Sequence, residues 1–142
     1  MTISYKFTMN IEYKNIKDFE VEQLRDLFLS VKWDSGNYPE KLKVAMKNSS
    51  SVYSAWDGDK LVGLVNCLSD GVMTAYIHFL LVHADYHGQG IGEKLMSLML
   101  EEYKDYLRKV LIAYPKALEF YKRCGFHVAD EKIPMFITTL KT

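Results

Sequence analysis

The chain has 142 residues, of which 49% are hydrophobic and 25% are charged, and its formal net charge at pH 7 is zero. That length suits one domain with a substantial core, so we expect a single domain over residues 1–142. A balanced charge gives no electrostatic reason to expect nucleic acid or an anionic membrane as a partner. Two cysteines without metal-ligand spacing favour a reducing compartment, and we expect a cytoplasmic protein without a metal site.

The first half of the chain is predicted to form a strand, two helices and three antiparallel strands. Residues 1–9 alternate weakly and are predicted as either an extra strand or a loose leader, and residues 10–14 as a strand. Apolar residues at helical spacing predict one helix over about 19–31, capped by Asp18, and a second that begins at Pro39. Strands are then predicted at 52–56, 61–68 and 73–82, joined by turns at Asp57-Gly58 and Ser69-Asp70-Gly71.

The second half of the chain is predicted to alternate helices and strands. Residues 90 to about 107 repeat apolar side chains at every fourth position and are predicted as a helix. The apolar run 110–113 is predicted as a short buried strand, parallel to its neighbour because a helix precedes it. A helix over about 115–124 follows, and closing strands are predicted at 126–128 and 135–140.

Residues 80–93 combine the end of an apolar strand, a polar link, a glycine-rich turn and the start of a helix. Glycines at 88, 90 and 92 leave backbone N–H groups open to a ligand, and the helix adds its unpaired N–H groups and the positive end of its dipole. That combination binds phosphate. The spacing fits neither a P-loop nor a dinucleotide fingerprint, because Gly-Lys-Ser/Thr is missing and Glu93 stands where a third glycine would be.

The stretch resembles the acetyl-CoA signature of the GNAT N-acetyltransferases, Arg/Gln-x-x-Gly-x-Gly/Ala, which here is His87-Gly88-Gln89-Gly90-Ile91-Gly92. A second segment, from Ala117 to Phe126, resembles the family's A-x-x-F-Y-x-x-x-G-F motif. The resemblance extends over roughly residues 11–140. It implies an α/β (α+β) GNAT fold, with a mixed, mostly antiparallel sheet of about six or seven strands and about four helices.

The resemblance implies transfer of the acetyl group of acetyl-CoA directly to a primary amine in a ternary complex, without a metal. The pyrophosphate would bind N–H groups of the glycine turn, contributed by Gly88, Gln89, Gly90, Ile91, Gly92 and Glu93. His87, where relatives have Arg or Gln, would donate from its ring. The pantetheine arm would pair with the backbone of Leu80, Leu81 and Val82, where two strands splay apart. Tyr114, where relatives often have Asn, would contact the same arm.

The proton-transfer residues are predicted from the second motif and from the strand at 73–82. Tyr121 matches the tyrosine that protonates the leaving thiolate in relatives, and it is also expected to lie near the thioester. Many relatives carry a Glu base at the position of Tyr76, and His78 follows two residues later on the same face. Either side chain could pass a proton through water, and Asp70 at the strand end is a third candidate.

The acceptor site is predicted at the loop between the first two helices and at the neighbouring strand ends, from Trp33, Asp34, Tyr38 and Asp70. Aromatic rings beside a carboxylate suit a cationic or aromatic amine. The middle of the chain looks most like small bacterial and plant-type arylalkylamine (serotonin-like) acetyltransferases, through Leu27-Phe28 to Trp33, Ala55-Trp56-Asp57-Gly58 and Ser69-Asp70-Gly71. A small-molecule amine is therefore the expected acceptor.

Two other functions fit the same resemblance. One is a catalytically weak module that binds or senses acyl-CoA, suggested by the missing Glu and Asn. The other is an acetyltransferase that modifies Lys side chains or N-termini of proteins. The closing strand predicted at 135–140 could also pair across a homodimer.

Overall fold

The computed structural model describes residues 10–142, and its strands form one five-stranded sheet in the order β1-β2-β3-β4-β5. The prediction for residues 1–9 lies outside the described residues. Strands β1 to β4 pair antiparallel, and β5 pairs parallel to β4. The bounds are Glu12–Lys14 for β1, Ser51–Asp57 for β2, Lys60–Ser69 for β3, Thr74–Val82 for β4 and Arg108–Val110 for β5.

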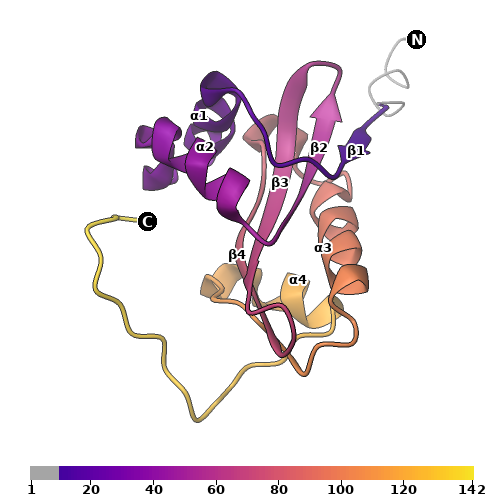
Figure 1. The fold of residues 1–142 in the computed structure, drawn as a ribbon, viewed down its shortest axis with the longest axis vertical. Helices are drawn as coiled ribbons and strands as arrows, with labels where there is room; N and C mark the ends of the chain where they lie inside the picture. The colour runs from indigo at the N-terminus through magenta and orange to yellow at the C-terminus, as the bar shows by residue number, and fades with distance from the viewer. Residues whose placement is uncertain (1–9) are drawn as a thin grey trace.

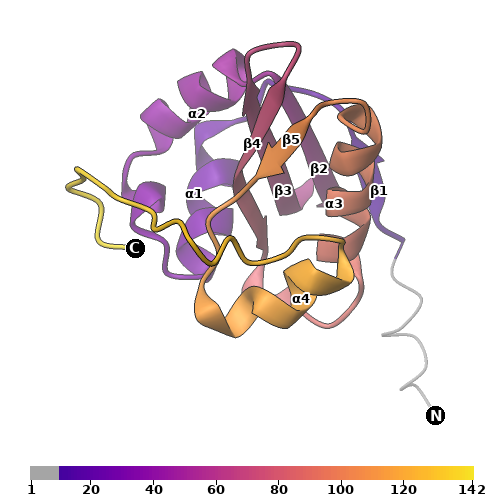
Figure 2. The ribbon, with the colours of Figure 1, turned by 90° about the horizontal axis from the view of Figure 1, so that it is seen from below.

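Helices cover both faces of the sheet, as Figures 1 and 2 show. Apolar side chains of α1 (Val21–Ser30) and α2 (Pro39–Asn48) pack on one face, in a cluster that includes Phe28 and Met46. Those of α3 (Ile91–Glu102) pack on the other, and α4 (Leu118–Arg123) lies beside that second cluster. Strand β3 is buried on both faces, because Leu61 and Leu64 point to the first cluster and Val62 and Val65 to the second.

The first helix begins two residues later than a cap at Asp18 would set it. Glu20 is the N-cap, and its backbone N–H donates to the Gln23 side chain at 2.9 Å in a capping box. Asp18 instead accepts a hydrogen bond from Lys43 of α2 at 2.9 Å. The second helix begins at Pro39, as predicted.

The third helix ends at Glu102, before the predicted end near residue 107. The following residues form a turn whose carbonyl groups, those of Lys104 and Tyr106, accept hydrogen bonds from the Lys109 ammonium at 3.2 and 2.9 Å. A side chain thus satisfies carbonyls of the turn that takes the place of the last predicted helical residues. The buried spacing predicted for α3 is confirmed by Ile91, Leu95, Met99 and Tyr103.

Strand β5 confirms the predicted parallel pairing but not the predicted position or burial. It pairs Arg108–Val110 with Thr74–Tyr76, and Val110 is 39% exposed. The ladder starts early because the Arg108 N–H already donates to the Met73 carbonyl at 3.1 Å. The apolar residues 111–113 therefore leave the sheet.

The closing strands predicted at 126–128 and 135–140 are wrong, since the described chain has no strand after Val110. Over residues 10–142 the sheet consequently has five strands, where six or seven were expected for the fold. The tail runs away from the sheet and returns beside the loop after α1, where the Lys141 N–H donates to the Asp34 carboxylate at 3.0 Å (Figure 1). Alternating apolar residues alone do not make a strand, and here they lack a paired neighbour. Pairing of this segment across a homodimer stays a prediction.

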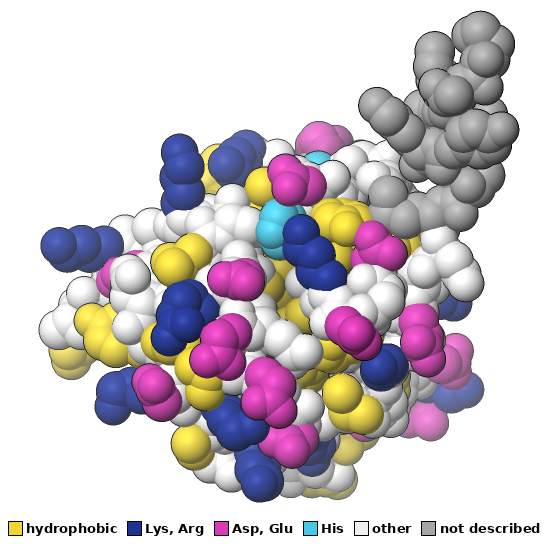
Figure 3. Space-filling view, turned by 90° about the horizontal axis from the view of Figure 1, so that it is seen from above, with side chains coloured by type: hydrophobic (Ala, Val, Ile, Leu, Met, Phe, Trp, Pro, Cys, Tyr) yellow, Lys and Arg dark blue, Asp and Glu magenta, His cyan; other side chains and the backbone are white. Residues whose placement is uncertain are grey.

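Charges are interspersed on the face drawn in Figure 3, where basic and acidic side chains alternate without a large patch of one sign. No helix of residues 10–142 is long and apolar enough to cross a membrane. Within the same residues, no group of three or more His, Cys, Asp or Glu side chains is placed to hold a metal ion.

Candidate active site

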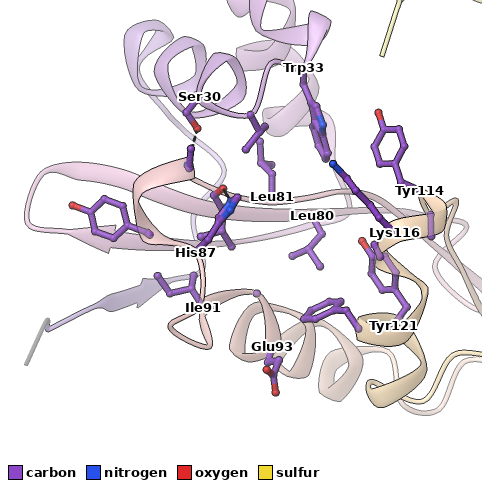
Figure 4. A pocket seen from close by; sticks show the side chains of 18 of the residues that line it. Ser30, Trp33, Leu80, Leu81, His87, Ile91, Glu93, Tyr114, Lys116 and Tyr121 are labelled. Atoms are coloured by element: carbon purple, nitrogen blue, oxygen red, sulfur yellow. Dashed lines mark hydrogen bonds between the residues drawn. The ribbon is translucent and has the colours of Figure 1, made fainter. Parts of the chain in front are cut away.

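A cleft of about 1060 Å³ opens between the end of β4, the glycine turn, the segment after β5 and α4. Its walls include most of the residues that the sequence predicts to bind the acetyl donor, acetyl-CoA. Figure 4 shows the cleft from close by. These residues are Leu80, Leu81, Val82, His87, Gly88, Gly90, Ile91, Gly92, Glu93, Tyr114 and Tyr121. Gln89 is the one predicted donor contact outside the lining.

The end of β4 gives the cleft an unpaired strand edge. Strand β5 pairs only with Thr74–Tyr76, so it leaves β4 before Leu80–Val82 is reached. On the other edge these three residues still pair with Gly63–Val65 of β3, which holds them extended. Among the described residues no strand covers the free edge, so its backbone groups face the cleft and can pair with an extended ligand.

The glycine turn leaves its backbone bare. Gly88 and Gly90 have left-handed φ values of 80° and 81°, and a Cβ built at either would meet no protein atom within 4 Å. A Cβ on Gly92 would lie 3.5 Å from Phe120, an ordinary contact, so alanine would fit there. Gly90 is the N-cap of α3, whose first N–H groups have no partner within the helix. These features fit a phosphate group.

His87 makes a contact that the sequence does not reveal. Its Nε2 lies 2.7 Å from the carbonyl oxygen of Val82. A carbonyl can only accept, so Nε2 carries the hydrogen in this arrangement, and a neutral ring then offers only an acceptor at Nδ1. A neutral His87 is therefore a poor phosphate donor, and it occupies a backbone group of the free β4 edge.

Tyr121 points into the cleft from α4 (Figure 4). Its ring packs edge-on against Phe120 and Phe126, with ring centroids 5.1 and 6.1 Å away. Burial raises the pKa of the Tyr121 phenol, and the nearby Cys124 thiol adds to the effect. The hydroxyl therefore keeps its proton at neutral pH, as a general acid must.

His78 lines the cleft, whereas Tyr76 lies outside its lining. The His78 ring is reached by solvent, yet it stacks between Tyr76 and Phe79 at 5.4 and 4.0 Å. Desolvation by these neighbours lowers the pKa of His78, so the imidazole is neutral near pH 7 and can accept a proton. Burial raises the pKa of Tyr76, which makes that phenol a poor base.

Comparison with known proteins decides the family. The model of the acetyltransferase (GNAT) family matches residues 17–126. The chain belongs to the GNAT family. Members of this family use acetyl-CoA.

Two curated relatives and one solved structure place the chain within the GNAT family. The chain is 34% identical over 119 residues to the uncharacterized N-acetyltransferase ycf52 of Pyropia yezoensis, which covers 80% of this chain and 66% of that protein. It is 31% identical over 131 residues to a Glycine max protein named histone acetyltransferase TAP1, and this match covers 82% of this chain and 55% of that protein. The chain thus spans two thirds or less of the length of these relatives. A GNAT acetyltransferase structure from Streptococcus pneumoniae superposes with a TM-score of 0.79 at 28% identity, covering 92% of this chain and 99% of that one.

On the acceptor side of this GNAT domain, only one of the four predicted residues reaches the cleft. Trp33 lines it, with its ring 6.3 Å from Tyr114 and 6.2 Å from Phe79. Tyr38 is exposed at the start of α2, outside the lining. The Asp34 carboxylate accepts hydrogen bonds from the Lys141 N–H and the Asn37 amide, which lower its pKa.

Asp70 lies in the turn between β3 and β4, also outside the cleft lining. One carboxylate oxygen accepts hydrogen bonds from the N–H groups of Val72, Met73 and Thr74 at 2.8 to 3.1 Å. These bonds lower the pKa of Asp70 and account for the residue as part of the turn. The structure thus does not bring this carboxylate to the acceptor side.

Lys116 lines the cleft, although no motif in the sequence marks it as a site residue. Its side chain extends across the cleft toward Trp33 (Figure 4). The residue follows Pro115 in a single 3-10 turn, and that turn points it inward. In the sequence it looks like an ordinary cation on a helix surface, and only its place next to the second motif signals otherwise.

Proposed function

We propose that the chain is an N-acetyltransferase that moves the acetyl group of acetyl-CoA to a primary amine of a small molecule. One observation carries the proposal: a single cleft joins the bare glycine turn, the free edge of β4 and the phenol of Tyr121. These supply, in order, an anion site, a strand edge for an extended arm and a proton donor. Holding donor and acceptor together would provide much of the acceleration.

Bound acetyl-CoA would supply a thioester, whose carbonyl carbon forms a bond to the amine nitrogen as its bond to sulfur breaks. Tyr121 would give its phenolic proton to the leaving sulfur and regain one from solvent. His78 would accept, directly or through water, the proton that the attacking nitrogen loses. Backbone N–H groups on the free edge of β4 would stabilise the developing oxyanion.

The cleft mouth favours an amine with an aromatic body. The rings of Trp33 and Tyr114 line the cleft with their centroids 6.3 Å apart, and Phe79 packs against Trp33 from the core side at 6.2 Å. Lys116 extends into the same region and would repel a polycation, because like charges brought together are unfavourable. We therefore place arylalkylamines ahead of polyamines as acceptors, in line with the resemblance found in the sequence.

A second candidate is acetylation of a protein amine. Solvent reaches the His78 ring, so the acceptor side could admit a chain segment as well as a small molecule. The soybean relative is named a histone acetyltransferase. A module that binds acyl-CoA without turnover would share the donor half of the cleft.

The deciding experiment is a calorimetric titration with acetyl-CoA, with desulfo-CoA and adenosine diphosphate as comparison ligands, followed by turnover assays. One-site binding that requires the pantetheine arm, then turnover of arylalkylamines, is the expected result. Turnover of Lys peptides but not free amines would favour the second candidate. Binding without turnover of any amine would leave the sensing module, and no binding of acetyl-CoA would refute the proposal.

A further inference from the structure

Strand β4 contains a bulge beside the cleft. Val65 of β3 lies opposite Leu80, and Cys67 lies opposite Ile77. One β3 residue, Asn66, therefore faces two residues of β4, His78 and Phe79. A bulge of this kind re-aims side chains and bends the strand. Its effect here is visible in the close stacking of the two successive rings, whose centroids are 4.0 Å apart.

The bulge shifts the alternation of side chains by one residue, so that it exchanges the two faces of the sheet on which the side chains at the end of β4 lie. Before it, Ala75 and Ile77 pack in the cluster on the α3 face of the sheet. After it, Leu80 belongs to that same face, while Phe79 and Leu81 pack on the α1 face. Without the extra residue, strict alternation would turn every side chain after His78 to the opposite face. The bulge thus sets how the cleft-lining end of β4 is presented.

Asn66 holds the bulge with its side chain. It is 1% exposed, and its Oδ1 accepts a hydrogen bond from the Phe79 N–H at 2.8 Å. The bulge interrupts the ladder between β3 and β4 at this N–H, so the side chain takes the place of a backbone acceptor. Its Nδ2 donates to the Ser49 hydroxyl at 3.1 Å, and that hydroxyl donates to the Ala45 carbonyl of α2 at 2.7 Å. The amide side chain accepts from the strand through its oxygen and donates to the serine through its nitrogen at the same time. The bulge is therefore tied to the end of α2.

We propose that Asn66 is a positioning residue for acetyl transfer, an inference that rests on the proposed function. By fixing the bulge, Asn66 directs His78 to the cleft and sets the free edge of Leu80–Val82 at the place where β4 has parted from β5. The residue touches no part of the cleft itself, because it is absent from the lining and buried between the sheet and α2. It acts through the geometry of β4 alone.

The test compares Asn66→Leu, which keeps the volume but loses both hydrogen bonds, with Val52→Ala. Val52 is fully buried on β2 and takes part in neither side-chain hydrogen bond of Asn66, so its truncation costs stability while both of those bonds stay in place. Asn66→Leu is expected to lower kcat/KM for acetyl-CoA by about 10- to 100-fold and to shift the acid limb of the pH profile. Val52→Ala is expected to lower Tm while its kinetic constants stay within about twofold of wild type.

A second measurement tests, without any substrate, whether the bulge keeps its hydrogen bond to Asn66. Amide hydrogen exchange at Phe79 should be protected in the wild type and in Val52→Ala, and unprotected in Asn66→Leu. Asn66→Asp, which keeps an accepting oxygen, should restore part of both the protection and the activity. If Asn66→Leu does not fold, Ser49→Ala replaces it, with a smaller loss of kcat/KM and of Phe79 protection.

If Asn66→Leu folds and shows wild-type kinetics, the positioning role of Asn66 is overturned and the proposed function is not affected. The same holds for wild-type kinetics in Ser49→Ala where that variant replaces Asn66→Leu. A wild-type protein that turns over no amine would instead refute the proposed function, so the two failures are distinguishable.

Discussion

The two walls of the cleft are built in different ways. The donor wall is one continuous stretch, residues 80–93, and it offers mainly backbone groups: a free strand edge, a bare glycine turn and a helix start. The acceptor wall is assembled from side chains of separate elements, among them Trp33, His78, Tyr114 and Lys116. A site built from one contiguous segment has a recognisable sequence motif. A wall built from residues of separate elements has none, because folding alone brings those residues together. Substitutions on one wall can therefore be compared with substitutions on the other.

The largest expected effect comes from Tyr121, which stands where the two walls meet. Tyr121→Phe should lower kcat by about 10- to 1000-fold, because the leaving sulfur loses its proton donor, and should leave acetyl-CoA affinity unchanged. Steady-state kinetics and calorimetry measure the two quantities. Tyr103→Phe is the matched control, because it removes another hydroxyl of raised pKa, one that hydrogen-bonds Ser51 and does not line the cleft. Unaltered turnover in Tyr121→Phe would exclude the acid role.

The donor wall is tested at Gly90. Gly90→Ala places a side chain in a left-handed conformation and in the space open to a ligand, so acetyl-CoA should bind about tenfold more weakly or worse. Gly71→Ala is its control, because Gly71 has a φ of 89° and equally free surroundings but lies in the β3–β4 turn outside the cleft. Both variants should lose similar stability. Equal acetyl-CoA affinity in the two would show that the glycine turn holds no phosphate.

The donor wall is also the part that the sequence predicts well. Glycine spacing and the switch from strand to helix are local, and the structure has the expected strand end, turn and helix start at 80–93. The bulge in β4 could not be predicted, because it depends on Asn66 reaching across from β3. The position of β5 and the unpaired tail could not be predicted either. A short apolar run can form a strand with several neighbours or none, and only tertiary contacts decide which. The sequence predicts that Asp34 and Asp70 bind the acceptor, but hydrogen bonds from backbone N–H groups, one of them as distant in sequence as Lys141, occupy their carboxylates in the folded chain.

On the acceptor wall, His78 gives a pH dependence whose sign follows from its surroundings. Desolvation lowers its pKa below the ordinary value of 6.5, so the neutral, proton-accepting ring persists into mildly acidic solution. The ratio kcat/KM should fall only as pH drops through that lowered pKa. His78→Gln should remove this acid limb and lower kcat by about tenfold or more. An acid limb that survives in the variant would assign the base to another group.

A smaller effect is expected at Trp33. Trp33→Leu should raise KM for an arylalkylamine by about fivefold, in keeping with the loss of one aromatic contact of about 1 kcal/mol. The dissociation constant of acetyl-CoA should not change. Tyr38→Leu serves as control, since Tyr38 is a nearby aromatic residue outside the cleft. Equal KM values for the two variants would remove Trp33 from the acceptor site.

The smallest expected effect belongs to His87, because its two possible roles oppose each other. Its hydrogen bond to the Val82 carbonyl occupies part of the free edge, while its ring also lines the cleft beside the glycine turn. His87→Ala frees that carbonyl and removes a side chain near the anion site, so it should change the affinity for acetyl-CoA by no more than about two- to threefold. Calorimetry with the variant measures this affinity. A larger loss would place the His87 ring in the anion site, and an unchanged affinity would mean that backbone groups alone form that site.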